Sequence, residues 1–388
     1  MNFFASRFAA IFLLLSALAF PGVGCAGLES GLRSSGDGAW MRSEAQKRGL
    51  QLPDPTALTR ATQNEVRTVV GSYGTPTERM RRLVRYLVDS DRVHFQYSLN
   101  HSLTAEQAFQ AHRGDCMAYT NLYVALARAL DVPASFVRRT ELPYLYAHED
   151  VLYASSHMAA ANHTSWGTLL VDFSMEHTDA QVSRYRDTSD ADAFALFYNN
   201  LAMEELAHGE GAAAEKTLRF LVEMRPHLKE LAGNLGIVLL HERRPLEALA
   251  VYEAALQRFP GELNLYTNAA QAARYAGQGQ LADSLMAKAE SMSGGNDPSF
   301  LFNRGLVRYE KASYQRAAED FRDAARTQPS NAVILTWMVR ALLSSGQTSE
   351  GVRAFEHLCE VAPASHFLSQ LALQFPVLAA ERARRVRH

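Results

Sequence analysis

Apolar residues recur at steps of three and four between residues 116 and 130, the spacing of one buried helical face. Asp115 is a favoured N-cap residue, Gly114 permits a tight turn before it, and Asp131-Val132-Pro133 ends the run. The pattern therefore predicts a helix with Cys116 in its first turn. Its buried face would consist of Tyr119, Leu122, Tyr123, Leu126 and Leu130.

Short apolar and β-branched runs follow this helix. They cover residues 134–142, 156–161 and 168–173. They predict three strands, the last two joined as a hairpin. His157 and Asp172 lie on the two hairpin strands, so we expect their side chains to lie side by side. Upstream, the apolar spacing over 65–89 predicts helices that cover the helix at 116.

From about residue 195 the pattern repeats with a period of 34. Pro226 and Pro260 are 34 residues apart, as are Pro329 and Pro363, and 69 residues separate Pro260 from Pro329. The period predicts about five helical hairpins over 195–365. A cap helix and a basic tail, expected to be solvated, complete the chain over 366–388.

Small and large residues recur at fixed positions within these hairpins. Gly236 precedes Tyr252 in the second hairpin, and Gly305 precedes Phe321 in the fourth. This pattern resembles tetratricopeptide (TPR) repeats, in which small residues let two helices approach and large residues fill the neighbouring hole. The resemblance implies an all-α TPR solenoid whose groove receives a protein or peptide partner.

The N-terminal residues predict export. Arg7 and the apolar run over 8–20 are typical of a secretory signal, here residues 1–25, and the run is shorter than the ~20 residues of a membrane span. Residues 22–25 resemble a bacterial lipobox, which implies lipidation of Cys25 and attachment to the outer membrane, facing the periplasm. Ordinary cleavage after Ala26 is the alternative. Residues 26–60, rich in Gly, Ser, Arg and Pro, are expected to form a linker without order.

The composition narrows the classes of function. A chain of 388 residues with 47% hydrophobic residues is long enough for two or three globular units. A net charge of -2 gives no electrostatic basis for nucleic-acid binding. The three cysteines, Cys25, Cys116 and Cys359, cannot form a disulfide framework, so we expect Cys116 to be a free thiol and Cys359 a core residue. Metal-ligand spacing is missing, so we expect neither a metal nor another cofactor.

Cys116, His157 and Asp172 form a candidate nucleophilic site. A thiol near its reference pKa of ~8.5 is mostly protonated at neutral pH, and a helix N-terminus or an imidazole can activate it. The predicted helix start supplies the first activator and His157 the second, while Asp172 would hold the ring tautomer. His163, in the predicted hairpin turn, is the alternative base.

The run RGDCMAYTNLYVALARALDVPASFVR, together with His157 and Asp172, resembles the transglutaminase-like superfamily over roughly residues 75–180. The spacings of 41 residues from Cys116 to His157 and 15 from His157 to Asp172 suit that superfamily. The resemblance implies an α+β papain-fold domain, expected over 61–190, with Cys116, His157 and Asp172 as its catalytic residues. Ala159 stands where the family often has an aromatic residue.

The same resemblance implies acyl transfer through a thioacyl intermediate on Cys116, with a peptide or amide as substrate and hydrolysis favoured over transamidation. With the predicted signal, this describes an exported cysteine peptidase or amidase of the envelope, coupled to a TPR protein-binding domain. The alternative is a non-catalytic scaffold or assembly lipoprotein in which the transglutaminase-like domain is degenerate.

Overall fold

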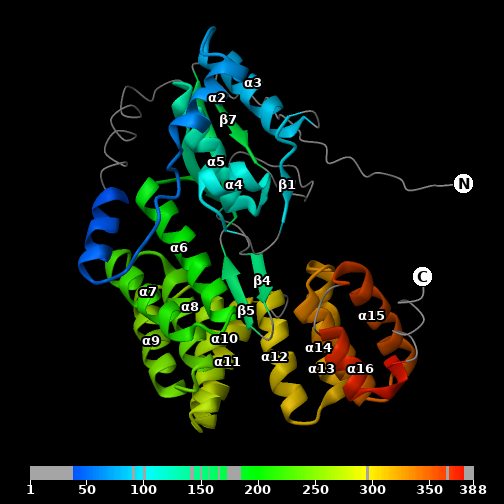
Figure 1. Cartoon of the computed structure of the whole chain (residues 1–388). Helices are drawn as coiled ribbons and strands as arrows, with labels where there is room; N and C mark the ends of the chain where they lie inside the picture. The colour runs from blue at the N-terminus through cyan, green and yellow to red at the C-terminus, as the bar shows by residue number, and fades with distance from the viewer. Residues whose placement is uncertain are drawn as a thin grey trace, which may run out of the picture. The chain divides into compact units, whose positions relative to one another are not determined.

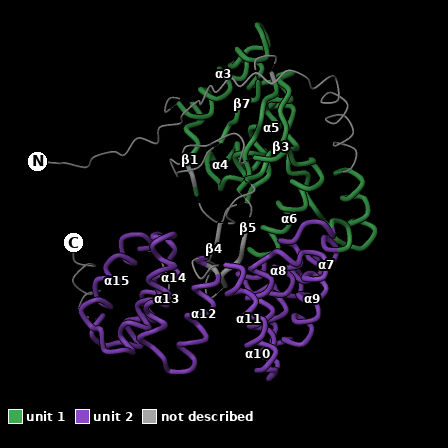
Figure 2. Tube along the Cα trace, turned by 180° about the vertical axis from the view of Figure 1, so that it is seen from behind, with its two compact units in different colours: residues 1–144, 156–204, 223–225 green, residues 145–155, 205–222, 226–388 purple. Residues whose placement is uncertain are grey.

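A computed structural model describes residues 38–89, 92–98, 102–139, 144–148, 151–155, 157–164, 167–172, 185–293, 297–363 and 367–379. The predicted signal, Cys25 and the basic tail lie outside these residues. The chain divides into two compact units. Unit 1 comprises residues 1–144, 156–204 and 223–225, and unit 2 comprises 145–155, 205–222 and 226–388 (Figure 2).

Helix α5 (Cys116–Ala129) is the centre of unit 1 (Figure 1). Every residue from Cys116 to Ala127 is buried. The helix packs against α2 (Arg60–Val70), α3 (Pro76–Val88) and α4 (Ala105–Ala111), and also against strands β3 and β6. The predicted helix at residue 116 and its covering helices are therefore present.

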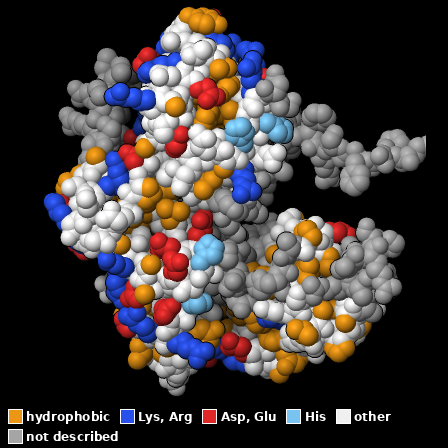
Figure 3. All heavy atoms as spheres, in the orientation of Figure 1, with side chains coloured by type: hydrophobic (Ala, Val, Ile, Leu, Met, Phe, Trp, Pro, Cys, Tyr) orange, Lys and Arg blue, Asp and Glu red, His pale blue; other side chains and the backbone are white. Residues whose placement is uncertain are grey.

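Capping residues set where the covering helices begin. Thr75 accepts a hydrogen bond from the Glu78 backbone while the Glu78 side chain accepts one from the Thr75 backbone, which is the capping box expected before a helix. The outer face of α3 is polar, with Arg81 and Arg85 exposed, and Figure 3 shows basic side chains at this end of the molecule.

A four-stranded antiparallel sheet follows α5 in sequence, with the order β7-β6-β3-β8. Its strands are β3 (Ser135–Arg139), β6 (Met158–Thr164), β7 (Gly167–Val171) and β8 (Tyr185–Thr188). β6 and β7 form the predicted hairpin, with Ala161 opposite Leu170. The hydrophobic pattern did not predict β8. Shorter pairs join β1 (Gln96–Tyr97) to β2 (Arg113–Gly114), and β4 (Tyr144–His148) to β5 (Val151–Ser155).

The prediction of a linker without order over residues 26–60 is wrong for the second half of that range. Residues 38–47 form a helix, and Met41 and Ala45 are fully buried. Arg42 pairs with Asp54 at 2.7 Å and lies over the Phe194 ring. Two buried apolar residues one helical turn apart give too short a pattern to stand out from a Gly- and Ser-rich background. Packing on the rest of unit 1 helps to stabilise this helix.

Consecutive helices pair along the repeats. α8 packs with α9, α10 with α11, α12 with α13 and α14 with α15, while α8, α10, α12 and α14 contact one another in turn. The helices are α6 (Asp190–Ala207), α7 (Gly211–Met224), α8 (Lys229–His241), α9 (Pro245–Arg258), α10 (Leu263–Tyr275), α11 (Gly279–Ser293), α12 (Pro298–Glu310), α13 (Tyr314–Thr327), α14 (Ala332–Ser344), α15 (Thr348–Val361) and α16 (Phe367–Gln374).

The predicted small-to-large contacts stabilise these pairs. A Cβ on Gly236 would lie 2.2 Å from the Tyr252 ring, and one on Gly305 would lie 2.6 Å from Phe321. Both rings are fully buried, so the missing side chains are what allow the helices to approach. Cys359 is half-buried and packs against the core of the last repeats, as expected for a core residue.

The cap helix expected at the start of 366–388 corresponds to α16, which ends at Gln374, and a new helical turn follows over 376–379. Among the described residues, no helix combines the length and the apolar character that crossing a membrane would require.

Candidate active site

Cys116 is the first residue of α5 and is 4% exposed. Asp115, the N-cap residue, accepts a hydrogen bond from the Ala118 backbone N–H at 2.8 Å, as the sequence predicted. Its carboxylate therefore completes the first turn of the helix. The sulfur lies at the N-terminal end of a 14-residue helix, where the helix dipole favours negative charge.

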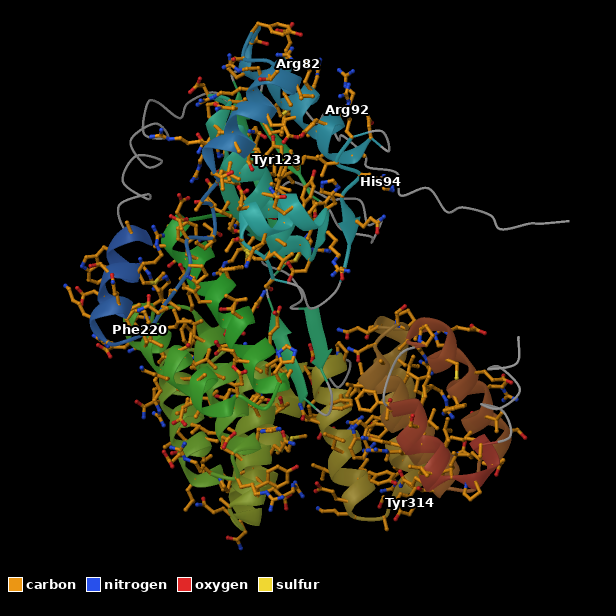
Figure 4. All side chains as sticks on the ribbon, in the orientation of Figure 1. Arg82, Arg92, His94, Tyr123, Phe220 and Tyr314 are labelled. Carbon is orange, nitrogen blue, oxygen red and sulfur yellow. The ribbon has the colours of Figure 1, made fainter. Side chains whose placement is uncertain are left out.

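Hydrogen bonds set the register of α5 against β6. The Thr120 hydroxyl contacts the Cys116 carbonyl at 2.7 Å and the Met158 carbonyl at 3.3 Å. One turn further on, the hydroxyl of Tyr123, labelled on α5 in Figure 4, donates to the Asn162 side chain. The helix that carries Cys116 is thus fixed directly to the strand that begins after His157.

His157 and Asp172 lie at adjoining ends of β6 and β7. The His157 Nε2 atom lies 2.8 Å from Asp172 Oδ1 and 2.9 Å from Oδ2, and the imidazole is buried. The same ring is hydrogen-bonded to the Cys116 side chain. Since Nε2 faces the carboxylate, Nδ1 is the nitrogen left for the sulfur. The structure thus brings together Cys116, His157 and Asp172.

The electrostatics favour a charged pair. Burial lowers the pKa of His157, but hydrogen bonds to Asp172 and Cys116 and the charges of those groups outweigh it, so the pKa is raised well above its ordinary value. Burial raises the pKa of Asp172, and the contacts with His157 and Tyr185 and the charge of Arg139 outweigh it, so that pKa is lowered. Both shifts favour an ion pair between a protonated ring and an ionised carboxylate.

Tyr185, on β8, is a further residue of the site that the sequence pattern did not predict. Its hydroxyl donates to Asp172 Oδ2 at 2.5 Å, and its ring meets His157 edge-on with centroids 6.4 Å apart. Tyr185 is 8% exposed, so it covers the His157–Asp172 pair from one side. A four-residue edge strand gives no periodic signal, so the sequence offered nothing that would single this tyrosine out.

His163 lies away from Cys116. Its ring contacts Ser135 and Thr168, each at 3.2 Å, and its Nε2 lies 3.6 Å from the Asp187 carboxylate. Its side chain is 51% exposed, and six residues of strand, about 20 Å, separate it from His157. The structure therefore supports His157 rather than His163 as the partner of the thiol.

Within the described part of the chain, no group of three His, Cys, Asp or Glu side chains could hold a metal ion.

Two family models match the chain. The model of the transglutaminase-like superfamily matches residues 63–165, which include Cys116 and His157. The model of the tetratricopeptide repeat matches residues 199–262. No curated protein matches the chain.

Several solved structures are similar to part of the chain. A chain of the APC/C hetero-tetramer Cut9-Hcn1 is 16% identical with a TM-score of 0.40; the match covers 48% of this chain and 38% of that chain. The TPR protein TTC0263 of Thermus thermophilus is 19% identical with a TM-score of 0.41, over 48% of this chain and 99% of that protein. PilF of Pseudomonas aeruginosa is 18% identical with a TM-score of 0.36, over 49% of this chain and 89% of that protein.

The sheet, the central helix and the family models lead to one assignment. The chain carries a transglutaminase-like α+β domain followed by an all-α solenoid of tetratricopeptide repeats.

Proposed function

We propose that this chain is an exported envelope protein whose transglutaminase-like domain cleaves amide bonds through Cys116, while its repeats bind a protein or peptide. The observation that carries the proposal is the buried His157 ring, hydrogen-bonded on one side to Asp172 and on the other to Cys116. The N-terminus of α5 supplies the second activator that a nucleophilic thiol needs.

The reaction would proceed in two steps. The Cys116 sulfur attacks the carbonyl carbon of the substrate, the protonated His157 ring gives its proton to the leaving amine, and the C–N bond breaks to leave a thioester. Water then attacks the thioester carbon and gives a proton to His157. The C–S bond breaks, its electron pair returns to the Cys116 sulfur, and the carboxylic acid leaves. The Cys116 backbone N–H, at the helix start, is a suitable donor to the transient oxyanion. An amine in place of water would give transamidation.

The repeats support the binding part of the proposal. Tetratricopeptide repeats generally mediate protein–protein interactions, and in this chain α8, α10, α12 and α14 form one continuous layer. α10 and α12 border a hollow lined by Thr267, Gln271, Arg274 and Leu306 among others. The hollow has room for about one water molecule, so the binding proposal rests on the continuous layer of helices.

The proposal that the protein is exported rests on residues 1–25 alone. Their charged start, apolar run and lipobox-like end support export and lipidation of Cys25, with the mature protein held at the outer membrane and facing the periplasm.

The alkylation rate of Cys116 against pH tests the catalytic part. We would compare the full-length parent, His157→Ala and the control His163→Ala, with mass spectrometry separating the Cys116 adduct from those of Cys25 and Cys359. We expect a rate that stays high down to about pH 6 in the parent and in His163→Ala, and that collapses in His157→Ala. A rate that rises only through about pH 8.5 in all three proteins would favour the non-catalytic scaffold instead.

A further inference from the structure

A path of hydrogen bonds connects helix α6 to the start of α5. Glu204 Oε1 accepts a hydrogen bond from the Ser102 backbone N–H at 2.9 Å. The Ser102 hydroxyl donates to Asp115 Oδ2 at 2.7 Å, and Asp115 Oδ1 caps α5. Ser102 and Asp115 are 3% and 4% exposed, so water hardly competes for these bonds.

Each bond in this path constrains the next. The contact with Glu204 holds the Ser102 backbone, which aims the hydroxyl at one oxygen of Asp115. Asp115 therefore keeps its other oxygen on the Ala118 N–H, and the first turn of α5 keeps its geometry around Cys116. A rotation of the Asp115 carboxylate would break both contacts at once.

Helix α6 also contacts the other end of α5. Arg128, in the last turn of α5, forms a two-pronged pair with Asp190 at the start of α6, with distances of 2.6 and 2.9 Å. Asp190 and Glu204 are 14 residues apart, and Asp115 and Arg128 are 13 residues apart, or about 20 Å along either helix. One helix thus holds the helix of Cys116 at both ends.

The environment of Glu204 fits this role. Burial raises its pKa to about 7; the Ser102 backbone N–H and the Ser102 side chain lower it in part by hydrogen bonding, and the charge of Asp115 raises it further. At neutral pH the carboxyl is thus partly protonated, and in either form an oxygen can accept the Ser102 N–H. The match to the tetratricopeptide repeat begins at residue 199, so Glu204 belongs to the first helix of the repeats.

We infer that Glu204 is a positioning residue of the active site, acting through Ser102 and Asp115 on the helix start that carries Cys116. The first repeat helix is then part of the catalytic unit as well as of the binding array. The inference rests on the proposed function of Cys116 as a nucleophile.

The test uses the full chain with Glu204→Ala, Glu204→Gln and Ser102→Ala. Glu205→Gln is the matched control, because Glu205 is the next residue of α6, is also partly buried, and has a raised pKa caused by burial and by Glu210. Two quantities are measured at pH 7 for each variant: the alkylation rate of Cys116, and amide hydrogen exchange of peptides that cover the first turn of α5. The unfolding midpoint is recorded beside them.

We expect Glu204→Ala and Ser102→Ala to slow alkylation about five-fold and to speed exchange of the first turn of α5. Glu204→Gln should recover most of the parent rate, because its amide oxygen can accept the Ser102 N–H. Glu205→Gln should behave as the parent. A merely structural role for Glu204 would lower the unfolding midpoint of Glu204→Ala while leaving both quantities unchanged, and that result overturns the inference.

Failure of the proposed function would look different. If alkylation in the parent does not depend on His157, Cys116 is not an activated nucleophile, and hydrogen exchange alone then reports on Glu204. Unchanged exchange in Glu204→Ala and Ser102→Ala would reject the positioning role in that case too.

Discussion

Tyr185 shows how a single side chain completes the candidate site. His157 and Asp172 already contact each other at 2.8 Å, but a carboxylate that is only partly buried can rotate. The Tyr185 hydroxyl donates to Asp172 Oδ2, and both carboxylate oxygens stay directed at the His157 ring. It also lowers the pKa of Asp172, which keeps that group ionised beside the protonated imidazole.

We therefore predict that Tyr185→Phe slows alkylation of Cys116 at pH 6.5 about ten-fold, since a hydrogen bond to a charged acceptor contributes ~1.5 kcal/mol. The ring remains, so the packing against His157 is kept. Tyr86→Phe is the control, because Tyr86 donates a comparable bond to Glu65 at 2.9 Å on the covering helices. Equal rates for Tyr185→Phe and the parent would contradict this role.

Glu204 also predicts a pH dependence of stability. Burial raises its pKa from 4.5 to about 7, so the folded protein binds this proton more tightly than the unfolded chain, and stability falls as pH rises between those values. The glutamine in Glu204→Gln cannot ionise. We expect this variant to match the parent at pH 4.5 and to exceed it at pH 8 by at most ~3 kcal/mol, measured by urea unfolding. A parent at least as stable as the variant at pH 8 would show that the folded protein does not disfavour the charged form.

At the scale of elements, close helix packing decides the stability of the repeats. Gly236 on α8 and Tyr252 on α9 meet where no side chain fits between them. The Tyr252 ring cannot move aside, because it is fully buried and its hydroxyl already contacts the Gly233 carbonyl at 3.3 Å.

Gly236→Ala should therefore destabilise the repeats by about 1–3 kcal/mol, the usual cost of overpacking a core. Gly261→Ala is the matched control, because a Cβ there would meet nothing within 4 Å. Urea unfolding followed by circular dichroism measures both. Equal midpoints for the two variants would mean that α8 and α9 can separate at little cost.

At the scale of the whole molecule, the proposed location depends on Cys25. We predict that the parent expressed in bacteria incorporates labelled palmitate and fractionates with membranes, and that Cys25→Ser loses the label and moves to the soluble fraction. Lipid on this cysteine would provide the anchor. A parent that is exported yet carries no label would favour ordinary cleavage after Ala26.

Much of the architecture follows from local pattern. The apolar spacing of period 3.6 after Asp115 predicted α5, and the 34-residue repeat of prolines and small residues predicted the helical hairpins. Both predictions work because apolar residues at helical spacing lie on one face of a helix, which is then buried. The order of Cys116, His157 and Asp172 on their elements was equally readable. The structure adds that their side chains meet.

Contacts between residues far apart in sequence depended on tertiary structure. Tyr185 on Asp172, Glu204 on Ser102 and the packing of residues 38–47 each join segments that have no periodic signal of their own. The choice of His157 over His163 is of the same kind. Both histidines lie on or beside one hairpin, and only the register of β6 against β3 and α5 directs one of them to the sulfur and the other to the surface. Sequence spacing specifies which face of an element is buried, whereas the partner it meets depends on how the whole chain packs.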